Sequence, residues 1–271
     1  MRSRHEIKTI ASGLFAAQRG TCILVILVEM LLASAVSSLA FIPLVGAVAV
    51  FILTIVFQAG VEGSFLKGVR GERMDVEDVF SAFSNGRFGR TLGGGAFRYL
   101  KVFLWMLPGL VLYMGGFIYL FVSLGFTVAG FMSDPGELSD LMSVGSAVGI
   151  SVSAIVMVAG YVLMLVFGII KQYAYIFTLQ ILMENPMVSP TYAVKLSEKM
   201  TSGHKGDLFV MQLSFIGWIL LGTLTLGILN LVYTTPRMQM TLAAYYYEIK
   251  QEALASGRVR PEEFQGAQYV Y

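Results

Sequence analysis

The stretch Gly203-His204-Lys205-Gly206 places an imidazole and an amine between two glycines, and these residue types could do chemistry. An imidazole that acts as a general base needs an acid or a nucleophile held beside it. The sequence positions no such partner by spacing, and it contains no recognisable hydrolase, metalloprotease or nucleotide-binding motif. We therefore expect a protein that is not an enzyme.

Metal and cofactor chemistry is limited by a shortage of ligands. The chain has two histidines, His5 and His204, and one cysteine, Cys22. A zinc site, a haem site and an internal disulfide are therefore not expected. The glycine-rich residues 93–97 lack the strand and helix that a dinucleotide-binding loop requires, so their glycines are predicted to allow close helix packing. We expect no cofactor and no metal.

Charged residues within apolar runs are costly in a membrane and therefore mark candidates for function. Glu29 and Arg237 lie at similar depths in the first and the last predicted spans, and we predict that they pair. Glu62 and Lys171 lie near the inner ends of two other spans. These two either pair with each other or extend to the membrane interface.

A second group of candidates is basic and lies where the chain enters the membrane. Gly203-His204-Lys205-Gly206 has a counterpart earlier in the chain, in which Arg87 follows a glycine and Arg90 comes three residues later. Amides after a helix stop, together with such cations, suit the phosphates of lipid headgroups. The sequence therefore predicts that His204, Lys205, Arg87 and Arg90 contact anionic headgroups.

Composition sets the elements that must position these residues. Of 271 residues, 56% are hydrophobic and 13% are charged, against about 25% charged in ordinary soluble domains. The mean hydropathy is +0.72, which is typical of a membrane protein. The formal net charge of +2 gives no basic field for nucleic acid, so no nucleic-acid partner is expected.

Five apolar runs are long enough to cross a bilayer core of about 30 Å. The last run could hold two spans with a break near residues 227–230, or one long helix. Basic residues flank the runs on the side of both termini, while residues 132–142 carry three acids and no base. Because lysine and arginine favour the cytoplasmic side, the sequence predicts an all-α polytopic protein with about six transmembrane helices and both termini cytoplasmic. The runs are residues 21–39, 41–66, 99–131, 143–183 and 208–249.

The predicted organisation is a single transmembrane domain with short additions. The N-terminal segment is read as an amphipathic surface helix or, alternatively, as a frayed tail. The apolar insertion on the outer side is expected to fold back at Pro135-Gly136, and it could dip into the outer leaflet or meet a partner. The segments are 1–20 (surface), 21–249 (transmembrane), the linkers 67–98 and 184–207, the insertion at about 125–153, and the cytoplasmic tail 250–271.

The two cytoplasmic linkers resemble each other. Each is predicted to hold a surface helix, beginning after Asp75 in one and after Ser189 in the other, and each ends at a glycine. Trp105 and Trp218 follow the linkers at matching positions. The sequence therefore predicts two parallel repeats of span, surface helix and span.

The C-terminal half resembles a bacterial integral membrane family known as domain of unknown function 975. The resemblance implies a protein of the bacterial cytoplasmic membrane, and the family supplies no established activity. One departure is Phe167 before Gly168, where the family usually has proline. The matching residues are Ser197, Gly203, His204, Lys205, Phe209, Leu213 to Trp218, Leu220, Leu221, Leu224, Thr225, Gly227, Ile228, Pro236, Thr241, Ala243 and Tyr245, preceded by Gly168, Lys171, Tyr173 and Tyr175.

Two functions account for these features. A transport or lipid- and amphiphile-handling module would use parallel repeats and buried charges without catalytic motifs. The alternative is a structural or assembly subunit that acts through the outer insertion or the tail. Expected partners are membrane lipids with anionic headgroups, and either a membrane protein or a second copy of the chain.

Overall fold

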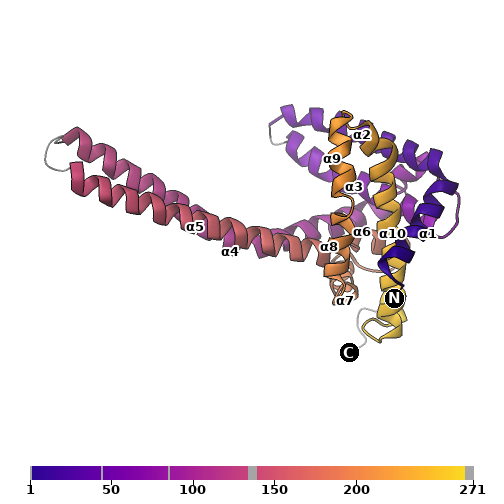
Figure 1. Cartoon of the computed structure of the whole chain (residues 1–271). Helices are drawn as coiled ribbons and strands as arrows, with labels where there is room; N and C mark the ends of the chain where they lie inside the picture. The colour runs from indigo at the N-terminus through magenta and orange to yellow at the C-terminus, as the bar shows by residue number, and fades with distance from the viewer. Residues whose placement is uncertain (1, 44, 85, 134–138, 266–271) are drawn as a thin grey trace. The chain divides into compact units, whose positions relative to one another are not determined.

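A computed structural model describes residues 2–43, 45–84, 86–133 and 139–265, and every regular element in these ranges is a helix (Figure 1). The chain divides into two compact units, Met1–Tyr99 with Tyr173–Tyr271 (unit 1) and Leu100–Gln172 (unit 2). Two long helices, α4 (Arg87–Ser133) and α5 (Ser139–Ala174), belong mostly to unit 2. The other elements, all in unit 1, are α1 (Arg4–Ala17), α2 (Arg19–Ser37), η1 (Ser38–Phe41), α3 (Val45–Val69), η2 (Val76–Phe80), α6 (Thr178–Glu184), α7 (Pro190–Met200), α8 (Lys205–Leu213), α9 (Ile216–Leu224), η3 (Asn230–Thr234), α10 (Thr235–Ala255) and η4 (Pro261–Gln265).

The N-terminal segment is a well-capped helix. The Ser3 hydroxyl accepts from the Glu6 amide and the Glu6 carboxylate accepts from the Ser3 amide, which together form a capping box at the start of α1. Ile7, Ala11 and Phe15 recur at helical spacing and are buried. Because α1 packs against α10, its apolar face is covered by protein.

α2 and α3 form an antiparallel pair. A Cβ on Gly46 would lie 1.8 Å from the carbonyl oxygen of Leu39, so this tight connection requires glycine.

The first linker differs from its prediction. Asp75 is an N-cap with a capping box to Asp78, as its residue type suggests, but the helix that follows is a single 3-10 segment, η2. The physical reason is tertiary packing, because η2 lies directly on α3. A Cβ on Gly60 would lie 1.9 Å from the carbonyl oxygen of Val79. Lys67 fixes the segment further through a 2.5 Å ion pair with Asp78.

The second linker holds the helix expected of it. Ser189 is the N-cap of α7 and Pro190 is its first residue, a position where the missing amide costs nothing. Gly203 has a φ of 87° after the end of this helix, and Gly86 has a φ of 68° before α4. Both predicted stops therefore use the left-handed conformation that glycine adopts readily.

The last apolar run turns back on itself. Leu226 and Gly227 have φ values of 53° and 86°, which reverse the chain between α9 and η3. Beside this turn, the side chain of Asn230 fills the space next to Gly222, so the two limbs touch. The break expected near residues 227–230 is confirmed, and the alternative of one long helix is wrong.

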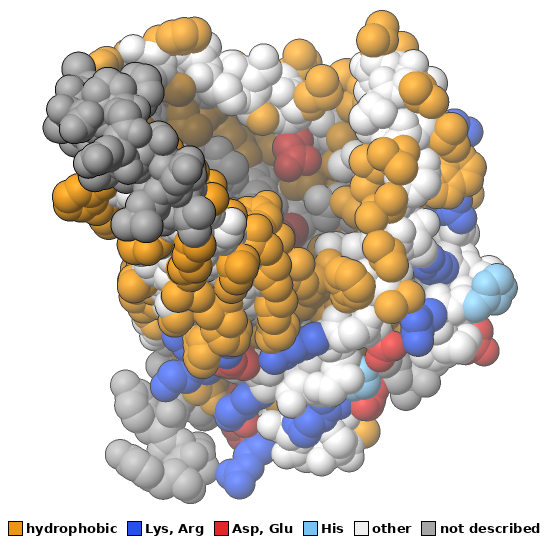
Figure 2. Space-filling model, turned by 60° about the vertical axis from the view of Figure 1, so that its left-hand side comes forward, with side chains coloured by type: hydrophobic (Ala, Val, Ile, Leu, Met, Phe, Trp, Pro, Cys, Tyr) orange, Lys and Arg blue, Asp and Glu red, His pale blue; other side chains and the backbone are white. Residues whose placement is uncertain are grey.

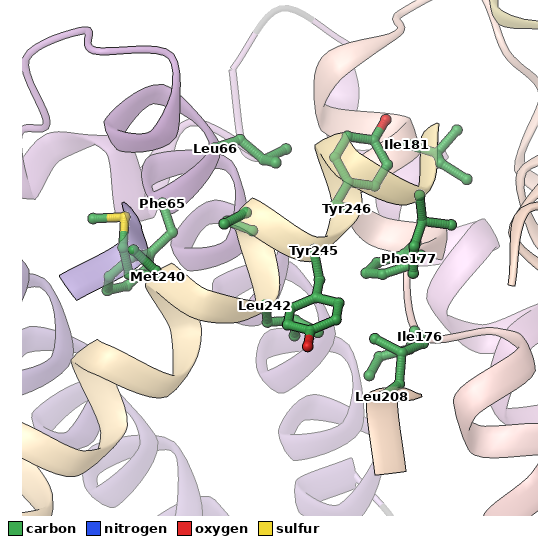
Figure 3. Packing of buried hydrophobic residues seen from close by; sticks show 14 of the residues in the cluster. Phe65, Leu66, Ile176, Phe177, Ile181, Leu208, Met240, Leu242, Tyr245 and Tyr246 are labelled. Carbon is green, nitrogen blue, oxygen red and sulfur yellow. The ribbon is translucent and has the colours of Figure 1, made fainter. Parts of the chain in front are cut away.

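The core of unit 1 surrounds α10 (Figure 3). Met240, Leu242, Tyr245 and Tyr246 of this helix are buried among side chains of the neighbouring helices. Phe65 and Leu66 come from α3, Ile181 comes from α6, and Leu208 comes from α8, while Ile176 and Phe177 precede α6. α10 therefore holds α3, α6 and α8 around a common centre.

Unit 2 is a hairpin of two helices that lie side by side (Figure 1). Small residues bring the backbones close, since a Cβ on Gly109 would lie 2.5 Å from the Met164 amide nitrogen and a Cβ on Gly160 would lie 2.4 Å from that of Tyr113. Pro108 lies within α4. The predicted turn at Pro135-Gly136 lies outside the described residues.

Five helices of the described chain are long and apolar enough to cross a membrane, which indicates a membrane protein. α10 is not among them. Its composition includes Arg237, Gln239, Glu248 and Lys250, so it is less apolar than these five helices. The predicted count of about six helices and the two parallel repeats go beyond what these five helices establish. The five candidates are Arg19–Phe41, Val45–Val69, Arg87–Phe126, Ala147–Glu184 and Lys205–Leu224.

Candidate functional site

Glu62 is a buried carboxylate in the C-terminal half of α3. Its residue is only 3% exposed, and its Oε1 accepts a 3.0 Å hydrogen bond from Nε2 of Gln58, one turn earlier. Its Oε2 is buried without a hydrogen-bond partner among the described residues. A buried ionised carboxylate needs an opposite charge or a proton, so a glutamate at this position is costly in an apolar helix.

The opposite charge near Glu62 is Arg98, a residue that sequence reasoning missed. Arg98 on α4 is also 3% exposed, and its charge attracts the Glu62 carboxylate, while Glu29 on α2 adds a repelling negative charge. The sequence signal was the glycine-rich segment just before it. Gly94 packs on Leu182 and Gly95 packs on Ile55, so α4 approaches closely and carries Arg98 inward one turn later.

The predicted Glu29–Arg237 pair is not formed. Arg237 instead donates to Ser12 of α1, from Nη2 at 2.6 Å and from Nε at 3.1 Å, and to the hydroxyl of Tyr233. Its guanidinium also lies 5.1 Å from the Tyr233 ring centroid. The N-terminal helix therefore supplies the partner that the first span was expected to supply.

Lys171 lies in unit 2 and Glu62 in unit 1, so their proposed pairing stays a prediction. Within unit 2, the Lys171 ammonium lies 4.1 Å from the centroid of the Trp105 ring, a cation–π contact. Trp105 also packs edge-on against Phe167, with centroids 6.0 Å apart.

His204 belongs to a cluster of charged residues at the start of α8. Its Nε2 lies 2.9 Å from Oε1 of Glu252 on α10, and its Nδ1 lies 3.4 Å from Oδ2 of Asp207. Arg258 donates to the same Glu252 oxygen at 2.9 Å, and Arg4 of α1 lies 3.3 Å from Asp207. These contacts join α1, α8 and α10. A role for His204 in headgroup contact stays a prediction.

The other three headgroup candidates have different surroundings. Arg90 uses its guanidinium to donate to the carbonyl oxygens of Asn185 at 3.1 Å and Val188 at 2.7 Å, which fixes the start of α4 to the loop before α7. Arg87 and Lys205 are half-buried first residues of α4 and α8. On the face drawn in Figure 2, basic side chains lie among acidic ones in the lower and right-hand parts of the view.

A cavity of about 290 Å³ lies between α1, α10 and the end of α3. One part of its lining is apolar and the other part is polar. Arg2 forms a 3.1 Å ion pair with Glu248, and Arg70 donates to the Tyr247 hydroxyl at 3.2 Å. Hydrogen bonding to Glu72 raises the pKa of Arg70, so Arg70 stays positively charged. The lining residues are Arg2, Ile7, Ile10, Leu14, Val69, Arg70, Ala244, Tyr247, Glu248 and Gln251.

Among the described residues, no group of three or more histidine, cysteine, aspartate or glutamate side chains is arranged to hold a metal ion. What the arrangement offers is two buried groups of opposite charge, a charged cluster and an amphipathic cavity. These features can bind a charged or amphiphilic molecule by complementary charge and apolar contact.

The fold and these sites define a helical protein with several membrane-compatible helices and an amphipathic cavity beside the N-terminal helix. The chain belongs to the family described as "Protein of unknown function (DUF975)", whose profile matches residues 1–253. The match therefore extends over the N-terminal half as well as the C-terminal half. No curated protein and no solved structure matches the chain.

Proposed function

We propose that this protein is a lipid- or amphiphile-handling module of the bacterial cytoplasmic membrane, one that binds or moves its ligand without catalysing a reaction. The observation that carries the proposal is the cavity of about 290 Å³ beside α1. Its size is near the lower end of small-ligand sites, at roughly 300 Å³. Part of an acyl chain beside a polar head suits a cavity of this size and mixed lining.

The cavity has an apolar part and a polar part, as an amphiphile has an apolar chain and a polar head. Ile7, Ile10 and Leu14 present apolar side chains along one side of α1. Arg2 and Arg70 provide cations next to Glu248 and Tyr247 at the polar part. Burying a chain against the isoleucines and leucine is favourable at about 25 cal/mol per Å² of apolar area, while the polar groups orient the head.

The topology that accompanies this proposal has six crossings and cytoplasmic termini. The return limb, η3 and α10, runs antiparallel to the fifth candidate span, from Asn230 beside Gly222 to Glu252 beside His204. A segment that runs back alongside a membrane span over the same length must cross the same bilayer. Its polar residues are tolerated because α10 is surrounded by other helices.

The experiment is photolabelling of the protein in nanodiscs with a phosphatidylcholine that carries a diazirine in its acyl chain. We expect label in the peptides that contain α1 and residues 244–251. Ile10, which is 40% exposed and lines the cavity, is changed to glutamate, and labelling at these peptides should fall about tenfold because a carboxylate in an apolar wall is costly.

Ala16→Glu is the matched control, because Ala16 is exposed on the same helix and does not line the cavity. It should label like the unchanged protein. Equal labelling of Ile10→Glu and Ala16→Glu in folded protein would reject the cavity as the ligand site.

A structural or assembly subunit is the second candidate, favoured by unit 2. The part of α4 within this unit rises about 50 Å at 1.5 Å per residue, whereas a bilayer core measures about 30 Å. Apolar side chains such as Val111, Ile118 and Phe121 are exposed on it. Native mass spectrometry of the purified protein separates the two candidates. A stable dimer that lacks bound lipid favours the assembly role.

A further inference from the structure

Seven cations of unit 1 form ion pairs with acids. The ion pairs are Arg2–Glu248, Arg4–Asp207, Lys67–Asp78, Arg70–Glu72, Lys199–Glu263, Lys250–Glu184 and Arg258–Glu252. Several half-buried cations of unit 1, among them Lys8 and Arg237, are not in these pairs. Lys8 and Arg237 form no ion pair among the described residues, and their hydrogen bonds go to hydroxyl groups.

These two cations lie close to each other. The Lys8 ammonium donates to Ser214, at the junction of α8 and α9, and lies 5.2 Å from the centroid of the Phe215 ring. Arg237 donates to Ser12, which lies one turn after Lys8 on α1. The pKa of Lys8 is lowered by burial and then by the positive charge of Arg237. A structure that keeps two like charges together without an acid favours an anion between them.

The donors that remain match an oxyanion. A guanidinium has five N–H donors and an ammonium has three. Arg237 uses one N–H each from Nε, Nη1 and Nη2 on Ser12 and Tyr233, and Lys8 uses one on Ser214. About two donors on each side chain therefore stay available, and charge-assisted bonds to phosphate oxygens are the strong use of such donors.

The aromatic side chains around Lys8 and Arg237 indicate how deep the site lies in the membrane. The Tyr233 ring packs against Trp218 with centroids 5.1 Å apart, and Phe15 packs edge-on against the same tyrosine at 6.4 Å. Tyrosine and tryptophan beside lysine and arginine are typical of the boundary between the acyl chains and the headgroups. A phosphate at this boundary belongs to a phospholipid or comes from solution.

We propose that Lys8 and Arg237, steadied by Ser12, Ser214 and Tyr233, form a phosphate-binding site between α1, the α8–α9 junction and α10. The site is separate from the amphipathic cavity, because neither cation lines that cavity. On α1, Lys8 and Ser12 project from one side of the buried stripe, while the cavity residue Ile10 projects from the other side.

The test compares anionic with zwitterionic lipid on the full chain. Native mass spectrometry from nanodiscs of phosphatidylglycerol and phosphatidylcholine should show preferential retention of phosphatidylglycerol. Lys8→Gln should reduce that preference about tenfold, because a hydrogen bond to a charged group contributes roughly 1.5–3 kcal/mol, which corresponds to a factor of ten or more. Lys8→Arg should restore it. Lys195→Gln removes an exposed lysine elsewhere and should leave the preference unchanged.

A second arm adds inorganic phosphate to the detergent-purified protein and records thermal stability. Stabilisation of the unchanged protein but not of Lys8→Gln, with equal retention of both lipids, assigns the site to free phosphate. The proposal is overturned if Lys8→Gln behaves like Lys195→Gln in both arms. This result leaves the cavity untouched, since the cavity is probed by Ile10→Glu with a zwitterionic lipid.

Discussion

Gly60→Ala tests how the first linker, residues 67–98, is held against α3. The new Cβ would lie 1.9 Å from the carbonyl oxygen, 2.6 Å from the carbonyl carbon and 3.0 Å from the Cα of Val79. All three are backbone atoms, so no side-chain rotation relieves the clash. The linker must therefore shift away from α3 as a piece.

The cost follows from what the shift disturbs. Overpacking in a well-packed interior costs about 1–3 kcal/mol. If η2 leaves instead, the fully buried Val79 loses about 1.5–3 kcal/mol of burial. The Lys67–Asp78 pair adds less, because the lysine is 39% exposed. Either route predicts that Gly60→Ala lowers the free energy of unfolding by about 2–3 kcal/mol.

Two measurements check this value. Unfolding of the detergent-solubilised protein in a denaturant series gives the change in stability, and limited trypsin digestion reports cleavage after Arg73, an exposed residue of the linker. Gly60→Ala should lower stability and speed this cleavage together.

Gly13→Ala is the matched control for Gly60→Ala. No atom lies within 4 Å of a Cβ at Gly13 in α1, so alanine there should be neutral or stabilising by up to about 1 kcal/mol. If both variants have the same stability and the same cleavage rate, the contact between η2 and α3 does not exist and the reasoning is refuted.

Two further predictions concern ionic contacts. Arg98→Gln should destabilise the protein by about 3 kcal/mol, because Glu62 is left buried without its countercharge, and adding Glu62→Gln should recover part of the loss in a denaturant series. Burial raises the pKa of Glu263, but bonds from Lys199 and Tyr192 outweigh it and hold that pKa below the ordinary 4.5. The stabilising contribution of this contact is present above that ordinary value and is lost as pH falls through the lower, folded-state pKa. The protection factors of the amides of residues 256–265, which correct for the intrinsic pH dependence of exchange, should therefore fall on acidification, and Glu263→Gln should lower them at neutral pH.

Much of the architecture follows from local patterns. The apolar runs, the reversal near Gly227 and the cap at Ser189 depend on residue type and spacing, and the structure contains them. The helix expected after Asp75 is only one 3-10 segment, because its packing on Gly60 determines its conformation. Gly60 lies in α3, outside the local sequence of the linker.

The charged partners were harder to predict. Matching depth suggested that Arg237 pairs with Glu29, but depth alone does not say which helices are neighbours. α1 was treated as a surface segment, and its packing against α10 gives Ser12 to Arg237. Arg98 stood at the end of a basic linker, and only the close approach of Gly95 to Ile55 turns it inward.

The central position of α10 has a consequence for how the chain is made. A ribosome releases this helix after the five apolar helices, yet Met240, Tyr245 and Tyr246 occupy the middle of the packed core. The earlier helices must therefore enter the membrane before α10 has been made. α1 lacks its packing partner until synthesis is nearly finished. Shortened chains that end before residue 240 should therefore be removed by quality-control proteases.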